Sequence, residues 1–180
     1  MTSIKKNLLK SSTLIVLLVI VLCSIAYSSL NGNKWLSQRN KNSFQETVAN
    51  PITMRDSIVN FSMELLGTPY VERGSSQNGF DCSGFVYYVF QHFKIQVPRS
   101  SPQFEHFGKE IPVDSIQKGD ILVFLSPTSD VIGHVGIVTN PKGKESDFIH
   151  STSGREMKVV ISSLKKEGYA RRFVKAVRVF

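Results

Sequence analysis

The fold is decided by the stretch Gly79-Phe80-Asp81-Cys82-Ser83-Gly84-Phe85-Val86 and its continuation to Phe93. From Phe85 onward, apolar residues recur at the positions i, i+1, i+4, i+5 and i+8, which are Phe85, Val86, Val89, Phe90 and Phe93. This spacing places them on one face of a helix, turned toward a core. The sequence therefore predicts a core-facing helix over 82–93 whose first turn contains Cys82.

The residues before this helix predict another helix and a loop. Thr53-Met54-Arg55-Asp56 has the spacing of a capping box, and apolar residues follow it at near-helical spacing until Gly67 and Pro69. The segment from Gly67 to Gly79 is rich in turn residues, and we expect Gly74 and Gly79 to serve the backbone geometry of its turns. We expect a helix starting near Thr53, then a loop that leads into the helix over 82–93.

After this helix, the spacing of the apolar residues changes. Ser101-Pro102 is typical of an N-cap followed by proline at the first helical position, and predicts a short helix through Phe107. Short β-branched or aromatic runs follow, separated by Gly, Pro, Asn and Ser: 120–125, 132–139, 147–150, 158–161 and 173–180. Such runs are typical of an antiparallel meander. Helices followed by strands predict an α+β domain with a sheet of about five or six strands.

Composition limits the broad class of the protein. The chain has 180 residues, of which 41% are hydrophobic and 20% charged, so it is neither disordered nor collagen-like and is long enough for one core plus an appendage. Its net charge is +8, and three lysines stand in the first ten residues. Without a stripe of alternating basic and aromatic residues, we expect no nucleic-acid partner.

The N-terminus predicts export from the cytoplasm. Lys5, Lys6 and Lys10 precede an apolar run over 14–25, and Ser24-Ile25-Ala26 offers small residues for a signal peptidase. The uncharged stretch 11–30 also has the length of a membrane span, so residues 1–26 are an export signal or a retained anchor. Residues 27–52 are mostly polar and predict a flexible tether, which leaves 53–180 as the folded domain.

Cys82 is the residue whose chemistry needs explaining. The two cysteines are Cys23, which lies in the apolar leader, and Cys82, which would be an unpaired thiol in an exported protein. A helix N-terminus and a neighbouring histidine both lower a thiol pKa and make a nucleophilic thiolate. His134 and His150, on two neighbouring predicted strands, can supply a base and a partner that orients it.

Other interpretations of these three residues stay open at this level. A buried cysteine is usually a small hydrophobic residue, and a strand histidine is often structural. A zinc site is not expected, because the short paired ligand spacings of zinc sites are missing. His92 and His106 lie in polar helical contexts and are expected at the surface.

Five successive motifs resemble those of the NlpC family, papain-like cysteine endopeptidases of the bacterial cell wall. They are the stretch 79–86, then Val97-Pro98-Arg99-Ser100, the run 118–124, His134-Val135-Gly136-Ile137-Val138, and Phe148-Ile149-His150-Ser151. The resemblance covers residues 58–180, and the ending Tyr169-Ala170-Arg171-Arg172-Phe173 is similar to single-domain periplasmic members. It implies that Cys82 is the nucleophile, His134 the general base and His150 the orienting residue.

The same resemblance implies substrate contacts. Tyr70 would stabilise the oxyanion together with the backbone N–H of Cys82, and Asp81 and Ser83 would line a subsite for the stem peptide. Asp81 and Ser83 could equally serve only as helix caps.

One segment departs from the family pattern. Many relatives have an arginine, an aromatic residue and two glycines after the tyrosine, whereas this chain has Val71-Glu72-Arg73-Gly74. Val71 holds the place of the arginine and Arg73 that of the first glycine. The departure leaves the triad intact and bears on subsite preference.

The sequence thus predicts an exported peptidoglycan endopeptidase that cuts a stem or cross-link peptide bond, without metal or organic cofactor. An amidase with the same triad, or a catalytically silent wall-binding domain, are the alternatives. We expect a monomer in the periplasm or cell envelope, with membrane contact if the N-terminus is retained or lipidated at Cys23.

Overall fold

The computed structural model describes residues 19–28 and 52–180. Residues 19–28 form a helix, and the predicted tether over 27–52 lies almost wholly outside the described residues, as does most of the export segment over 1–26. Within the described part of the chain, no helix is both long and apolar enough to cross a membrane.

Within residues 52–180, two α-helices precede the six-stranded sheet, as the sequence predicts. Helix α2 spans Met54–Glu64, and the predicted capping box is present: Thr53 and Asp56 each accept a hydrogen bond from the backbone N–H of the other residue. Helix α3 spans Cys82–His92, with Asp81 as its N-cap. The loop between them contains a small antiparallel hairpin of β1, Ser75–Ser76, and β2, Gly79–Phe80. The turn-rich sequence of this loop did not predict the hairpin.

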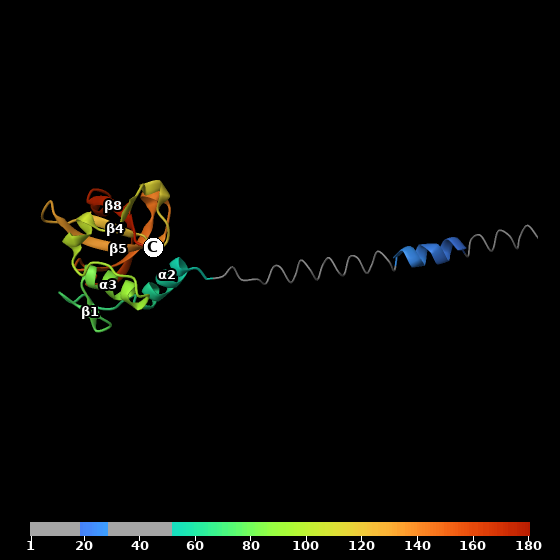
Figure 1. Ribbon diagram of the computed structural model, residues 1–180, viewed down its shortest axis with the longest axis horizontal. Coiled ribbons are helices and arrows are strands. Elements are labelled where there is room, and N and C mark those ends of the chain that lie inside the picture. Colours follow the sequence, from blue (N-terminus) through green and yellow to red (C-terminus); the bar gives the residue numbers. More distant parts are fainter. Residues whose placement is uncertain (1–18, 29–51) are drawn as a thin grey trace, which may run out of the picture. The chain divides into compact units, whose positions relative to one another are not determined.

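Within residues 52–180, six strands form one antiparallel sheet in the order β3-β8-β4-β5-β6-β7. Their bounds are Lys109–Ile111 for β3, Ile121–Leu125 for β4, Ile132–Asn140 for β5, Asp147–Thr152 for β6, Lys158–Ser163 for β7 and Phe173–Arg178 for β8. Strands β4 to β7 form the predicted meander. Strand β8 instead returns to pair with β4, as Figure 1 shows, and β3 is too short to be recognised by alternation.

Both faces of the sheet are covered. In β4, Ile121 and Val123 pack in the core that contains α3, whereas Leu122 and Phe124 pack in a second core on the other face. The four-residue helix α4, Glu167–Ala170, places Tyr169 against this second core. A strand buried on both faces reads as a continuous apolar run, as β4 does.

The cap of the short helix after α3 lies one residue earlier than predicted. It is a 3-10 helix, η1, over Ser101–His106, and its cap is Ser100, which exchanges the capping-box interactions with Gln103. The prediction of Ser101 as the cap is therefore wrong, because Gln103 lies three residues after Ser100 and completes its capping box. Ser101 is free to face α3 and is buried.

Candidate active site

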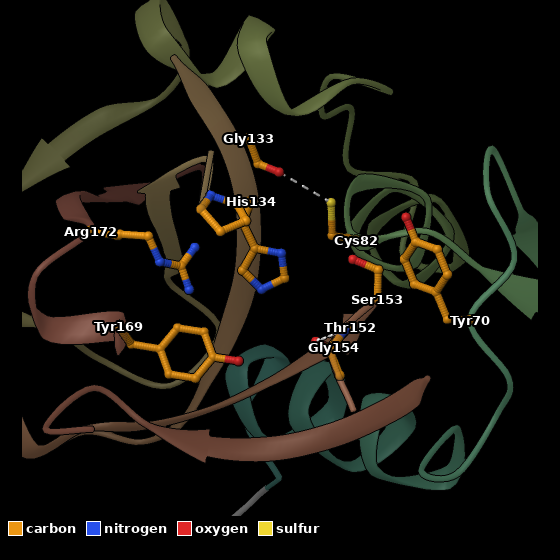
Figure 2. A pocket seen from close by; sticks show the side chains of 10 residues that line it. Tyr70, Cys82, Gly133, His134, Thr152, Ser153, Gly154, Tyr169 and Arg172 are labelled. Carbon is orange, nitrogen blue, oxygen red and sulfur yellow. Dashed lines mark hydrogen bonds between the residues drawn. The ribbon is translucent and has the colours of Figure 1, made fainter. Parts of the chain in front are cut away.

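Cys82 is the first residue of α3 and is half-buried. Its Sγ lies 3.3 Å from Ser101 Oγ and 3.7 Å from the carbonyl oxygen of Gly133, which precedes His134 on β5. The thiol therefore lies where three elements meet: the start of α3, the start of η1 and the beginning of β5. Figure 2 shows the Cys82 sulfur directed toward Gly133.

Asp81 holds the start of this helix in place. Its Oδ1 accepts a hydrogen bond from the backbone N–H of Gly84 at 2.6 Å, and both carboxylate oxygens accept hydrogen bonds from Arg99. The Ser83 hydroxyl donates to the same carboxylate at 3.2 Å. Asp81 thus has the capping role that the sequence left open, and neither Asp81 nor Ser83 lines the pocket at Cys82.

A glycine at position 84 allows the helix to approach the preceding loop. A Cβ on Gly84 would lie 2.0 Å from the carbonyl oxygen of Gly74, a distance that no side chain tolerates. The close contact between α3 and this loop therefore depends on glycine, which helps to position Cys82.

The two predicted histidines are hydrogen-bonded to each other. His134 lies on β5 and His150 on the neighbouring β6, and His134 Nε2 is 2.9 Å from His150 Nδ1. Gly136 makes room for them, because a Cβ there would lie 2.6 Å from the Phe148 ring and 3.1 Å from the Cβ of His150. The bond uses Nε2 of His134, so Nδ1 is the nitrogen left to exchange a proton with the thiol.

His150 is fully buried and has further partners. Its Nε2 lies 3.1 Å from the buried Ser162 Oγ on β7 and 3.4 Å from the hydroxyl of Tyr169. When His150 Nε2 donates its proton to Ser162, His150 Nδ1 accepts from His134 Nε2, and the unprotonated Nδ1 of His134 can act as a base. Ser162 and Tyr169 can thereby fix the tautomer of both rings.

Burial governs the electrostatics of the three groups. It lowers the pKa of His134 to about 4, with the Arg172 charge acting in the same direction. Burial, followed by the charge of His134, lowers the pKa of His150 to about 2. Both rings are therefore neutral near pH 7.

Burial also raises the pKa of the Cys82 thiol, and the Asp81 carboxylate raises it too. The Ser101 hydroxyl and the helix-start amides act in the opposite direction but do not outweigh burial. The expected lowering of the thiol pKa is therefore wrong for this geometry. A neutral thiol beside a neutral imidazole requires that the proton move as the thiol attacks.

Tyr70, Cys82 and His134 line one open pocket of about 330 Å³ (Figure 2). Tyr70 comes from the loop after α2, and burial raises the pKa of its hydroxyl, which stays protonated as a hydrogen-bond donor. His150 lies behind His134 and outside the lining. Of the predicted site residues, the structure thus brings the thiol, one imidazole and the tyrosine to the same pocket.

Several residues at the site were not predicted. Ser101, Ser162, Tyr169 and Arg172 contact the predicted residues or line the pocket. A polar residue within an apolar strand, such as Ser162, gives only a weak sequence signal. Arg172 is distinguished in the sequence only by its place in the basic ending. His92 and His106 are exposed, as expected.

The departing loop segment has an unusual backbone. Arg73 has φ +61°, in the left-handed region that favours glycine. Its carbonyl oxygen accepts a hydrogen bond from Arg99 at 2.7 Å, so the loop keeps this conformation and joins the network around Asp81.

Metal ligands are not grouped in the described residues. No set of three or more His, Cys, Asp or Glu side chains in 19–28 and 52–180 is arranged to hold a metal ion.

Two known proteins are similar in sequence to most of this chain. The chain is 35% identical over 126 residues to the murein DD-endopeptidase MepH of Escherichia coli, a match covering 67% of this chain and 44% of MepH. It is 30% identical over 159 residues to the gamma-D-glutamyl-L-lysine dipeptidyl-peptidase of Bacillus cereus, covering 86% of this chain and 46% of that protein. The match therefore spans less than half the length of each relative.

A solved structure has the same fold. An NlpC/P60 family protein from Bacillus cereus superposes with a TM-score of 0.63 at 31% identity, covering 72% of this chain and 41% of that one. The NlpC/P60 family model matches residues 67–178, from the loop before Tyr70 to the end of β8. This range includes every predicted site residue and more than half of the chain, which therefore belongs to the NlpC/P60 family.

Proposed function

We propose that this protein is a cysteine endopeptidase that hydrolyses a peptide bond in the stem peptides or cross-links of peptidoglycan. The observation that carries the proposal is the shared pocket of Cys82 and His134, with His150 bonded to the far side of the base. The names of the two relatives, which include murein and γ-glutamyl peptidases, support the substrate class.

The reaction follows from the arrangement of the three groups. The Cys82 sulfur attacks the scissile carbonyl carbon while His134 Nδ1 takes the thiol proton, and His150 stabilises the imidazolium that forms. His134 then returns this proton to the leaving amine, and a thioester remains on Cys82. Water, deprotonated by His134, attacks the thioester and releases the carboxylic acid and the thiol.

The oxyanion of the tetrahedral intermediate needs donors that are already in position. We assign this role to the Tyr70 hydroxyl and the backbone N–H of Cys82, which lies in the first turn of α3. Donors held in place by the fold stabilise developing charge without reorganisation. Asp81 and Ser83 contribute by orienting the helix start. We also propose that one of them contacts the stem peptide directly.

The site of action we propose is the bacterial cell envelope. The predicted export signal over 1–26 would deliver the domain across the membrane, and the tether over 27–52 would give it reach toward the wall if the leader is retained or lipidated at Cys23. A monomer is sufficient, since one chain supplies the thiol, the base and the oxyanion donors.

Mass spectrometry of purified peptidoglycan incubated with the protein tests this function, with Cys82→Ala as the matched control. We expect new amine ends at one stem or cross-link position, and a rate at least about 1000-fold lower for the variant. Release of whole stem peptides from glycan would instead identify the amidase. Intact peptidoglycan with both proteins, together with binding to it, would identify a silent binding domain and refute the proposal.

A further inference from the structure

The pocket at Cys82 contains one cationic side chain, Arg172, which the mechanism above does not use. Arg172 follows α4 and lines the pocket together with Cys82 and His134. Figure 2 shows its guanidinium turned toward the His134 ring from the side opposite Cys82. None of the ion pairs within residues 52–180 includes Arg172.

The fold holds this guanidinium rigidly. Nε donates to the carbonyl oxygen of Gly168 at 2.8 Å, and Nη1 donates to that of Leu125 at 3.0 Å. The guanidinium carbon lies 5.3 Å from the centre of the Tyr169 ring. Nη2 makes no hydrogen bond with the residues that the structure describes, so a positive group with spare donors is fixed beside the reacting atoms.

The space around Arg172 continues beyond the pocket. A second hollow of about 430 Å³ shares Arg172 and Pro127 with the pocket and is further lined by Arg171 and by the loop 125–130. Asp130 lies in this outer hollow but not in the pocket at Cys82. A ligand that extends from Cys82 across His134 therefore passes Arg172 before it reaches any acidic side chain that lines either space.

We propose that Arg172 binds a carboxylate of the substrate next to the scissile bond, and so selects stem peptides whose carboxyl group at this position is free. The inference rests on the proposed function and specifies its substrate. A guanidinium with fixed geometry binds a carboxylate through charge-assisted hydrogen bonds. A carboxamide there is a weaker acceptor, and Arg172 has no acceptor for the hydrogen bonds that its NH₂ group would donate.

Carboxylate binding at Arg172 would also assist the chemistry. The Arg172 charge opposes protonation of His134, which must become an imidazolium when the thiol attacks. A carboxylate bound to Arg172 neutralises this charge and removes the repulsion. Substrate with a free carboxyl group would therefore gain in binding and in the rate of proton transfer.

Matched pairs of soluble stem peptides, one with free carboxyl groups and the other amidated, test the inference on purified protein. We expect the unmodified protein to prefer the free acid by about 10- to 100-fold in kcat/KM, and Arg172→Gln to lose this preference by losing activity on the acid alone. Arg171→Gln, which changes a neighbouring arginine in the outer hollow, should keep the preference. Equal loss on both peptides would assign Arg172 a merely structural role and overturn the inference.

Calorimetric binding of the same peptides to Cys82→Ala separates this inference from the proposed function. If Cys82→Ala binds the acid more tightly than the amide, and the added Arg172→Gln change abolishes the difference, the carboxylate site stands even if no bond is cut. If the two peptides bind equally, or neither binds, the inference fails whatever the activity. The acid-to-amide ratio is taken within each variant, so a change in folded fraction does not affect it.

Discussion

At the residue scale, the unusual feature is a histidine without solvent contact that bonds on both ring nitrogens. His150 is fully buried, with His134 at Nδ1 and Ser162 and Tyr169 at Nε2. A buried imidazole with both nitrogens occupied has a defined tautomer, and it imposes a defined tautomer on the ring bonded to it. In the proposed mechanism, Ser162 would therefore be a positioning residue that acts through His150.

Replacing Ser162 by alanine should lower kcat about tenfold and leave KM unchanged, because loss of one buried hydrogen bond weakens the orientation of the base and not substrate binding. Ser162→Thr keeps the hydroxyl and should retain most of the activity. Ser163→Ala, which alters the next residue on β7, is the control for strand damage. Steady-state kinetics on a soluble peptidoglycan fragment measures all three, and an unchanged kcat in Ser162→Ala would assign the orientation to Tyr169.

The buried imidazoles should make stability fall as the pH is lowered. An unfolded histidine titrates near 6.5, whereas the folded pKa is about 4 for His134 and about 2 for His150. Below about pH 6.5 the unfolded chain binds more protons, so each histidine lowers the free energy of unfolding by up to about 1.4 kcal/mol per pH unit until its folded pKa is reached. Above about pH 6.5 both rings are neutral in the folded and in the unfolded chain, so their titration no longer lowers the free energy of unfolding.

Urea unfolding at a series of pH values between about 7.5 and 5 measures this slope. We expect a shallower slope for His150→Gln than for the unmodified protein. His106→Gln, which changes an exposed histidine, is the matched control. Parallel curves for all three proteins would show that the His150 ring is not held neutral in the folded chain.

At the scale of elements, α3 carries Cys82, the proposed nucleophile, and specific interactions fix both of its ends. Asp81 caps the start, and at the other end Lys94 adopts φ +58° while the Ile95 N–H donates to the carbonyl oxygen of Phe90. This left-handed position after a helix is most often occupied by glycine. In α3, lysine thus occupies the left-handed position after the helix at which glycine is favoured.

Lys94→Gly should raise the free energy of unfolding by about 0.5–1 kcal/mol, because glycine adopts a left-handed backbone without a steric cost. Lys94→Ala removes the same side chain but keeps the Cβ, so it should leave stability within about 0.5 kcal/mol. Chemical denaturation compares the variants. A gain of similar size in both would attribute the effect to the lysine side chain and not to the backbone.

At the scale of the whole domain, one buried carboxylate joins segments that are distant in sequence. Asp120, which precedes β4, is 1% exposed and pairs with Arg55 of α2 at 3.1 Å and with Arg178 of β8 at 2.7 Å. Arg55 also lies over the Phe180 ring, with its guanidinium carbon 4.7 Å from the ring centre. Asp120 thereby joins helix α2 and strand β8 to the start of β4, which lies inside the sheet.

Asp120→Asn should lower the free energy of unfolding by about 3–5 kcal/mol, because it leaves two partly buried guanidinium groups without their counter-charge. Asp114→Asn, at an exposed position in the segment before β4, is the control and should change stability by less than about 0.5 kcal/mol. Thermal and urea unfolding give the comparison. A small effect of Asp120→Asn would mean that α2 docks through its apolar face alone.

The sequence by itself determined those features that depend on local periodicity and on residue type. The helix at Cys82, the capping box at Thr53, the α+β class and the pair His134 and His150 follow from spacing, motifs and family resemblance, and the structure confirms the helix, the cap, the class and the hydrogen bond between the two rings.

Only the tertiary structure decided the features that depend on which distant segments meet. The return of β8 to β4, Ser162 and Tyr169 behind His150, and Arg172 beside His134 all join residues that no local pattern relates. The raised thiol pKa belongs here too, because it depends on how much of the surrounding solvent the folded chain excludes, and burial is a property of the assembled core.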